Sequence, residues 1–365
     1  MPDFQYVDIR DDSLHNAIAA ESRIGVDTEF MRERTFYSQL CLVQISTGKN
    51  IFCADPLQAE SSDDAGTSSF WQALMRPAWV LHSGRQDMEV VYQASDCMPQ
   101  EVFDTQVAAS LLGYQPQIGY ANLVAELFGV ELAKSHTRAD WSRRPLDDAV
   151  LDYAAEDVLY LLTAYEILTE RLAKLDRLQW AMQDSADMLD ISLYANDPTL
   201  AINRLKGASA LRGSARVGAV GLADWREREA IRTNRPRQWI LRDPVLLDLA
   251  CNRPATKSEL GKISGLAGRT ISRAGAELLR ILNDADKDET YYEPPLRPNE
   301  KQKALLKELL RQVSGRAEQL GIATEIIAPR KELSAAMLGE RNSRVFRGWR
   351  NELLGSKLLE LLENG

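Results

Sequence analysis

The sequence predicts an α/β domain at the N-terminus followed by two all-helical blocks. Short apolar strand patterns alternate with helical patterns up to about residue 175, which is typical of a sheet flanked by helices. Beyond residue 200 only helical patterns remain. An acidic, proline-rich linker, Asp284–Asp288 with Tyr291–Pro298, divides these helices into two blocks. A chain of 365 residues has room for two or three such domains.

Five strands are expected in the first domain, because short β-branched or apolar runs end at turn residues. They are residues 23–29 (RIGVDTE), 40–46 (LCLVQIS), 51–53, 78–82 (AWVLH) and 101–104. Helices are expected after Gly84 and Asp104, and over 120–128 and about 147–175. Residues 60–70 are expected to form a polar loop before a short helix end at Trp71–Met75, and residues 176–200 a hinge-like transition.

Apolar residues that recur with a period of 3.6, together with helix-cap residues, predict the helices of the two blocks. In the first block we expect helices over Leu222–Thr233, Pro244–Ala250, Thr256–Ile263 and Arg269–Leu282. In the second we expect Glu300–Leu320, Lys331–Leu338 and Val345–Leu362. Both blocks contain a Trp-Arg pair, at Trp225 and Trp349, so they could be distant repeats, although the order of their parts differs.

The composition excludes several classes of protein. No run of 18 apolar residues is present, so no membrane span is expected. The N-terminal stretch MPDFQYVDIRDDS is acidic and has no apolar core, unlike a secretion signal. The four cysteines have no paired spacing, which argues against a zinc site or a disulfide framework. The chain is therefore expected to be cytoplasmic.

The charge is unevenly distributed along the chain. The net charge is −9, but residues 204–280 hold 16 Lys and Arg against 7 Asp and Glu, a local balance of +9. The remainder carries 28 basic and 46 acidic residues, a balance of −18. One basic module attached to acidic ones suggests contact with a polyanion through that module, or with a protein partner through its Arg-rich helices.

Paired carboxylates are the first candidate for a site. Asp27 and Glu29 are two residues apart on the 23–29 strand, so they point to the same face. Two carboxylates side by side repel each other unless a cation or a proton lies between them. A hard divalent cation would suit them. A solvated edge face is the alternative.

A second pair lies on the late helix, where Tyr153 and Asp157 are four residues apart and share one face. A phenol and a carboxylate at this spacing can reach one water or metal ion, although such pairs are usually surface pairs. Asp87 opens the helix that follows the 78–82 strand, near the end of the sheet where open α/β sheets place their sites. Its alternative role is that of a first-turn acid complementing the helix dipole. Asp104 is expected to be a helix N-cap, and His82 a packed histidine.

A cationic segment, KSHTRADWSRRPL at 134–146, precedes the Tyr153 helix. A loop that contacts phosphates would have this composition, and so would a solvated loop anchored by a buried tryptophan. Its candidate RNA-contacting residues are Lys134, Arg138, Trp141, Arg143 and Arg144. In the basic module the candidates are Arg226, Arg232, Arg235 and Arg237.

Taken in order, these pieces resemble the DEDD exonucleases of the tyrosine subclass: Asp27 and Glu29 on a first strand, Asp87 after a middle strand, then Tyr153 and Asp157. The segments that flank these residues are similar to those of ribonuclease D: DTEFMRERTFYSQLCLVQIS, LHSGRQDMEVV, FDTQVAASLLGY and DWSRRPLDDAVLDYAAEDVLYL. The segment WREREAIRTNRPRQWILRDPVLLDLACNRP is similar to the helicase-and-ribonuclease-D C-terminal (HRDC) domain. The last block resembles a second, degenerate copy.

The resemblance implies a ribonuclease H-like exonuclease domain at 1–200, with a mixed sheet flanked by helices. It further implies two all-α HRDC-type domains, at 201–290 and 291–365. It also implies 3′ to 5′ cleavage of RNA and trimming of transfer-RNA precursors. The protein is expected to be a monomer. A non-catalytic nucleic-acid-binding protein with a retired nuclease domain and a DNA 3′–5′ exonuclease are the alternatives. The intact set of four acids and one tyrosine favours an active enzyme.

Phosphodiester hydrolysis needs a water in line with phosphorus and stabilisation of the developing negative charge, which two divalent ions about 3.5–4 Å apart can supply. We expect Asp27 to bridge both ions, Glu29 and Asp157 to hold the water-bearing ion, and Asp87 to help hold the other. Tyr153 is expected to touch the attacking water, as a base or mainly to orient it. All-oxygen ligands favour magnesium or manganese over zinc.

Overall fold

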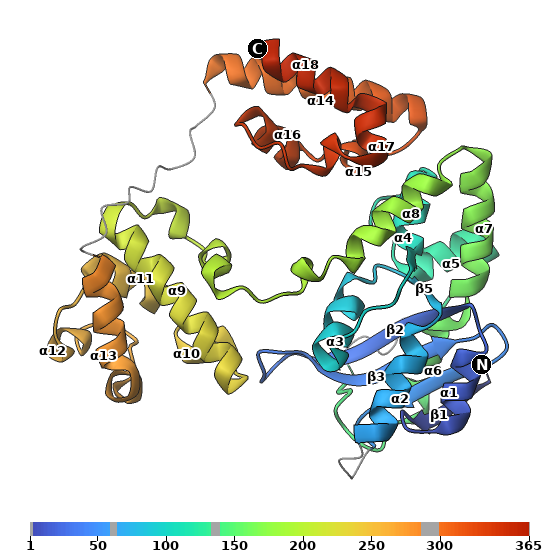
Figure 1. Ribbon diagram of the computed structural model, residues 1–365, viewed down its shortest axis with the longest axis horizontal. Coiled ribbons are helices and arrows are strands. Elements are labelled where there is room, and N and C mark those ends of the chain that lie inside the picture. The colour runs from blue at the N-terminus through green and yellow to red at the C-terminus, as the bar shows by residue number, and fades with distance from the viewer. Residues whose placement is uncertain (1–2, 59–63, 133–138, 286–298, 365) are drawn as a thin grey trace. The chain divides into compact units, whose positions relative to one another are not determined.

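The computed structural model describes residues 3–58, 64–132, 139–285 and 299–364, and the chain forms two compact units (Figure 1). Unit 1 combines Met1–Met31, Gln39–Tyr194 and Pro298–Gly365. Unit 2 combines Arg32–Ser38 with Ala195–Arg297. The last helical block therefore belongs to the same compact unit as the sheet. No helix in the described ranges is long and apolar enough to cross a membrane.

Unit 1 is built on a six-stranded sheet in the order β1-β4-β3-β2-β5-β6. The strands are β1 (Phe4–Asp8), β2 (Arg23–Met31), β3 (Gln39–Ser46), β4 (Ile51–Asp55), β5 (Ala78–Leu81) and β6 (Val102–Asp104). The pairs β2–β3 and β3–β4 are antiparallel, whereas β1–β4, β2–β5 and β5–β6 are parallel. This confirms the expected mixed sheet.

Helices cover both faces of the sheet (Figure 1). One face packs apolar strand residues such as Val26 and Val43 against α1 (Asp12–Ala19), α2 (Asp64–Met75) and α3 (Arg85–Ser95). The other face packs against α4 (Thr105–Leu111), α5 (Tyr120–Phe128), α6 (Asp148–Leu159), α7 (Leu161–Lys174) and α8 (Leu178–Ala186). Because side chains alternate along a strand, each central strand contributes to both cores.

Several elements differ from the expectation. The N-terminal stretch forms β1 and α1, which were not expected; β1 has half-buried side chains because it lies at the sheet edge. Helix α2 begins at Asp64, inside the expected loop. The expected long helix over 147–175 is interrupted at Tyr160, between α6 and α7. The expected hinge contains α8, whose Ala181 and Ser185 are buried. Tertiary packing overrides weak local propensity in these segments.

Unit 2 is all helical and contains α9 (Gly213–Thr233), α10 (Arg237–Ile240), α11 (Asp243–Asn252), α12 (Lys257–Leu260) and α13 (Gly268–Ala285). Helix α9 begins nine residues before the expected Leu222. The loop after β2 completes this unit, because Phe36 packs against Ala230 and Ile240. The backbone N–H groups of Phe36 and Tyr37 also donate to Asn234 Oδ1, at 3.0 and 3.1 Å.

The last helical block contains α14 (Glu300–Leu320), α15 (Thr324–Ile327), α16 (Arg330–Met337), α17 (Gly348–Arg350) and α18 (Ser356–Asn364). Its first three helices repeat the order of α9, α10 and α11: a 21-residue helix, a four-residue helix and a helix of 8 or 10 residues. The expected single helix over 345–362 is instead divided into α17, a π-helical turn and α18.

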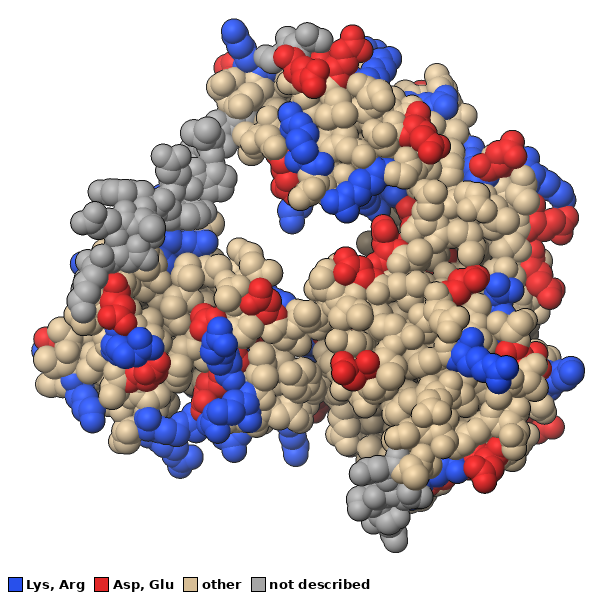
Figure 2. Space-filling view, viewed as in Figure 1, with Lys and Arg blue, Asp and Glu red and all other residues tan. Residues whose placement is uncertain are grey.

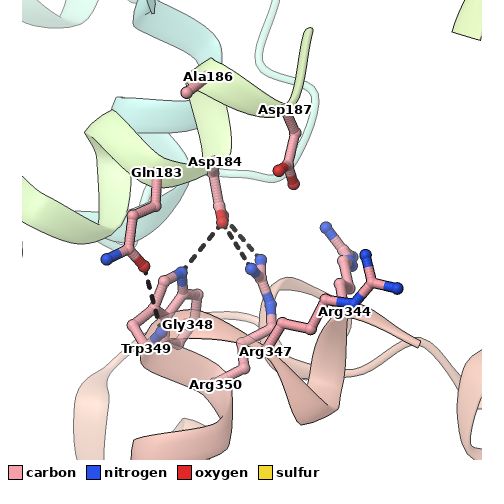
Figure 3. Close-up of a pocket in the computed structure, with 9 residues that line it drawn as sticks. All are labelled: Gln183, Asp184, Ala186, Asp187, Arg344, Arg347, Gly348, Trp349 and Arg350. Atoms are coloured by element: carbon pink, nitrogen blue, oxygen red, sulfur yellow. Dashed lines mark hydrogen bonds and ion pairs between the residues drawn. The ribbon is translucent and has the colours of Figure 1, made fainter. Parts of the chain in front are cut away.

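This block packs against α8 through an ion pair between buried Arg350 and half-buried Asp184 (Figure 3). Asp184 accepts from both terminal nitrogens of Arg350, at 2.5 and 2.7 Å, and from the Trp349 indole N–H at 3.0 Å. The Trp349 ring stacks on Trp180 with centroids 4.4 Å apart. Gly348 has φ of +50°, and a Cβ there would lie 2.7 Å from Gln183 Oε1, so this junction favours glycine. A pocket of about 320 Å³ lies beside these contacts.

Candidate active site

Two carboxylates are presented by the central strand β2. Asp27 and Glu29 point to the face covered by α6, while Ile24 and Val26 point to the opposite core. The antiparallel register sets Asp27 opposite Gln44 and Glu29 opposite Leu42. Both carboxylates are half-buried, so they are desolvated yet open to a small ion.

The second half of the site comes from α6, which carries Tyr153 and Asp157 on one face. Gly25 favours the close approach of α7 to the sheet, since a Cβ there would lie 3.1 Å from the Leu161 Cβ. As a result, carboxylate oxygens of Asp27, Glu29 and Asp157 all lie within 4.8 Å of one another. Residues separated by about 130 positions in the sequence thus form one acidic cluster that could hold a metal ion.

Asp87 lies in the first turn of α3, and its residue is only 7% exposed. Its carboxylate accepts a 2.5 Å hydrogen bond from the Thr28 hydroxyl, which ties α3 to strand β2. Asp87 is outside the group whose oxygens lie within 4.8 Å, but its charge raises the pKa of Asp27 and Glu29. The charge of Asp87 therefore adds to the negative potential of the cluster.

Two neighbouring residues have the structural roles expected for them. Asp104 caps α4, since its carboxylate accepts from the N–H groups of Gln106 and Val107. His82 is packed, with its ring nitrogens at 2.8 Å from the Thr105 hydroxyl and from the Ile118 carbonyl. Burial lowers the pKa of His82, so its ring is neutral at physiological pH.

The electrostatics of the cluster favour binding of protons or cations. Burial, followed by the charges of Asp87, Asp157 and Glu29, raises the pKa of Asp27 well above its ordinary value. Burial and neighbouring carboxylates raise the pKa of Glu29 to about 8. For Asp157, burial raises the pKa to about 7 against the lowering effect of a hydrogen bond from Tyr153. For Asp87, burial raises the pKa to about 6, although the Thr28 bond opposes it. A divalent cation would relieve this repulsion.

Tyr153 lies within this acidic environment. Its hydroxyl is hydrogen-bonded to Asp157, and its ring is 6.5 Å from that of Trp141. Burial, and then the charge of Asp157, raises the pKa of the phenol above its ordinary value. The hydroxyl therefore keeps its proton at neutral pH, which suits a group that orients a water better than one that removes a proton.

The residues expected to contact RNA differ in their burial and in their contacts. Lys134 and Arg138 lie outside the described residues. Trp141 is only 4% exposed, so it is the buried anchor of its loop and not a stacking platform. Arg144 forms an ion pair with buried Asp55 at 2.6 Å and also donates to the Cys41 carbonyl, so its side chain supports the fold. Arg143 remains exposed.

In the basic module the expectation for Arg226 is wrong. Its residue is 3% exposed, and its guanidinium donates to Asp243 and to the Leu241 carbonyl. Arg232 and Arg237 have ion pairs with Glu229 and Glu227, which reduce their availability. Arg235 is exposed.

Sequence analysis missed one candidate in this module, Trp239 on α10. It is 62% exposed, which is exceptional for a tryptophan, and exposed Arg242 follows it. In the segment RQWILRD the tryptophan begins a short apolar run, which suggests a buried position. Only the neighbouring arginines indicate that it lies at the surface.

A mixed sheet with these clustered acids defines a class of metal-dependent nucleases. The family model described as "3'-5' exonuclease" matches residues 9–173, and the HRDC domain model matches residues 221–282. Ribonuclease D of Acidiphilium cryptum is 37% identical over 361 residues, covering 96% of this chain and 90% of that relative. Ribonuclease D of Granulibacter bethesdensis is 36% identical over 366 residues, covering 97% and 90%. The chain belongs to the ribonuclease D family.

The solved structures agree with this assignment. The crystal structure of Escherichia coli RNase D, described as an exoribonuclease involved in structured RNA processing, superposes with a TM-score of 0.87 at 29% identity. The match covers 100% of this chain and 99% of that one. The catalytic core of RRP6 from Trypanosoma brucei shares the fold, with a TM-score of 0.59 at 22% identity. The family, the fold and the 3′–5′ exoribonuclease activity inferred from the sequence are therefore confirmed, and this class of exonuclease depends on divalent metal.

Proposed function

We propose that this protein removes nucleotides one at a time from RNA 3′ ends, using two divalent ions held by Asp27, Glu29, Asp87 and Asp157. The observation that carries the proposal is the convergence of three carboxylates within 4.8 Å, with Asp87 beside them. The donor set fits the ions, because every ligand is a carboxylate oxygen, and burial together with the neighbouring carboxylates raises the pKa values of Glu29 and Asp157. Magnesium or manganese suits such ligands better than zinc.

When bound, the ions would supply an acidified water and charge stabilisation on the scissile phosphate. The protein's own contribution is to hold the four carboxylates in place and to exclude bulk water from the cluster. Tyr153 adds a protonated hydroxyl, hydrogen-bonded to Asp157, that can hold a water for attack. We assign Tyr153 an orienting role, because its raised pKa makes it a weak base at neutral pH.

The substrate is proposed to be structured RNA, with transfer-RNA precursors as the preferred class. Similarity to the E. coli enzyme over the whole chain supports structured RNA. The basic module supports it as well, since neutralised phosphates and released counterions supply most non-specific affinity for nucleic acid. Figure 2 shows Lys and Arg side chains gathered along one edge of this module in unit 2.

We revise the contacting residues of the module to those that are exposed and form no ion pair with another described residue. Arg235, Trp239 and Arg242 are exposed at and around α10, where an indole near two guanidinium groups in the sequence can stack on a base. Further members are Lys206, Lys257, Lys262 and Arg269. A protein partner bound by the same surface remains the alternative occupant.

We keep the division of the chain at residues 200 and 290 as a proposal about evolutionary modules. The repeated order of helices in the last block supports a second, degenerate HRDC copy, even though that copy packs with the nuclease in unit 1. We also propose a cytoplasmic monomer. The four free cysteines are consistent with a reducing compartment.

The test is incubation of the protein with end-labelled RNA and with DNA of the same sequence, with and without magnesium. Stepwise shortening of RNA from its 3′ end in magnesium alone is expected. Binding without shortening would support a retired nuclease, and preferential shortening of DNA would support a DNA exonuclease.

A further inference from the structure

A buried amide beside the acidic cluster has no hydrogen-bond partner. Gln44, on β3, is fully buried, and neither its Oε1 nor its Nε2 has a partner among the described residues. Buried polar side chains are nearly always hydrogen-bonded, because leaving one unpaired is costly. A leucine or methionine would fill the same space without that cost, so packing alone does not explain a glutamine here.

The location of Gln44 suggests its partner. It is the residue directly opposite Asp27 in the β2–β3 register. Residues facing each other across antiparallel strands have Cβ atoms about 4.5–5.5 Å apart on the same face. The alternation of β3 agrees, because Val43 and Ile45 contribute to the opposite core. On its other side Gln44 faces Cys53 of β4, and α6 covers this row of the sheet.

Gln44 is therefore enclosed by two strands and by the helix that carries Asp157. Cys53 lies in the same row across the sheet as Gln44. Its thiol is a weak donor and lies 4.0 Å from the Leu151 carbonyl. Asp27 is the cross-strand neighbour with strong acceptor oxygens, and it lies directly opposite Gln44 on the same face of the sheet.

We propose that Gln44 is a positioning residue for Asp27. Its Nε2–H group donates to the Asp27 carboxylate when that carboxylate binds a divalent ion, and so fixes which oxygen faces the ion. Groups that hydrogen-bond a ligating carboxylate hold its orientation, and their loss typically weakens metal binding by about 10–100-fold. This inference rests on the proposed metal-binding role of Asp27.

The test compares Gln44→Leu with the parent in the full-length protein. Mn²⁺ affinity is measured by isothermal titration calorimetry, and the melting temperature is measured in EDTA. We expect Mn²⁺ affinity to fall by about 10–100-fold, while the melting temperature in EDTA stays the same or rises, because an unpaired buried amide has been removed. A merely structural amide would produce the opposite pattern, with a lower melting temperature and unchanged affinity. Gln44→Met, which keeps an unbranched chain, serves if the leucine variant does not fold.

Cys53→Ala is the matched control, because Cys53 lies in the same row under α6 but cannot support Asp27 through a strong donor. Its Mn²⁺ affinity should equal that of the parent. Parent-like affinity in both Gln44 variants, or an equal loss in Cys53→Ala, would overturn the positioning role and leave the metal site intact. Absence of Mn²⁺ binding by the parent would instead refute the proposed function, and the role of Gln44 with it.

Discussion

Replacing Asp157 by Asn should stabilise the metal-free protein at pH 8 and at the same time remove metal binding and cleavage. Burial raises the pKa of Asp157 from 3.8 to about 7, so the folded state binds its proton more tightly than the unfolded chain does. The stability that this group contributes is complete below about pH 4 and is lost as the pH rises through about 7. At pH 8 the ionised carboxylate opposes folding, and an amide in its place does not.

The magnitude follows from the shift of about three pKa units, which corresponds to about 4 kcal/mol at about 1.4 kcal/mol per unit. Because Asp157 keeps part of its surface in water and shares protons with its neighbours, we expect roughly half of this, ~2 kcal/mol. For a domain of this size that corresponds to a rise in melting temperature of roughly 4–8 °C.

The assay is differential scanning calorimetry of parent and Asp157→Asn in EDTA at pH 5 and pH 8, repeated with Mn²⁺. The difference between the two melting temperatures should be small at pH 5, where the parent carboxyl is still protonated in the folded state, and should widen at pH 8 with the variant higher. Mn²⁺ should raise the melting temperature of the parent alone, since a ligand stabilises only the state that binds it. A variant that is no more stable than the parent at pH 8 would refute the inference that burial of the Asp157 carboxylate opposes folding.

Four further outcomes are expected. Asp27→Ala should abolish RNA cleavage while circular dichroism shows a native fold; near-normal turnover would rule out the proposed ligand role. Tyr153→Phe should lower the cleavage rate by roughly 10²–10⁴ at saturating metal, with Mn²⁺ affinity retained, and parent-like cleavage would mark the tyrosine as structural. Arg350→Ala should lower the free energy of unfolding in urea by about 3 kcal/mol, because Asp184, whose side chain is only 12% exposed, loses its counter-charge; a loss below about 1 kcal/mol, typical of an exposed pair, would contradict this. Changing Arg235 and Arg242 to Gln should weaken binding of structured RNA and reduce the slope of log K against log salt by up to about two units, whereas unchanged slopes would favour a protein partner.

Local periodicity was sufficient to predict the pairs that make up the site. A spacing of two on a strand puts Asp27 and Glu29 on one face, and a spacing of four on a helix does the same for Tyr153 and Asp157. The neighbouring strands were also predictable, because apolar runs such as LCLVQIS in β3 end at turn residues. These features depend on residues close together in the chain, so the sequence is enough to reveal them.

Some residues were misjudged because their burial depends on contacts outside their own segment. Arg226 and Trp141 are residue types that are common on RNA-binding surfaces, yet both are buried. An arginine that pairs with Asp243 cannot be distinguished in the sequence from one that faces solvent. Helix α8 and strand β1 were missed because their propensities are weak and packing against the rest of unit 1 stabilises them.

The sequence by itself determined the family, the α/β and all-helical parts, and the residue types of the acidic cluster. Only the tertiary structure decided that Asp157 meets Asp27, because their contact depends on the strand order and is favoured by the absence of a side chain at Gly25. It also decided that the last block packs on α8 through Arg350 and that Gln44 lies opposite Asp27. These contacts join residues far apart in the chain, and their energies depend on burial and register, which no local pattern of residues encodes.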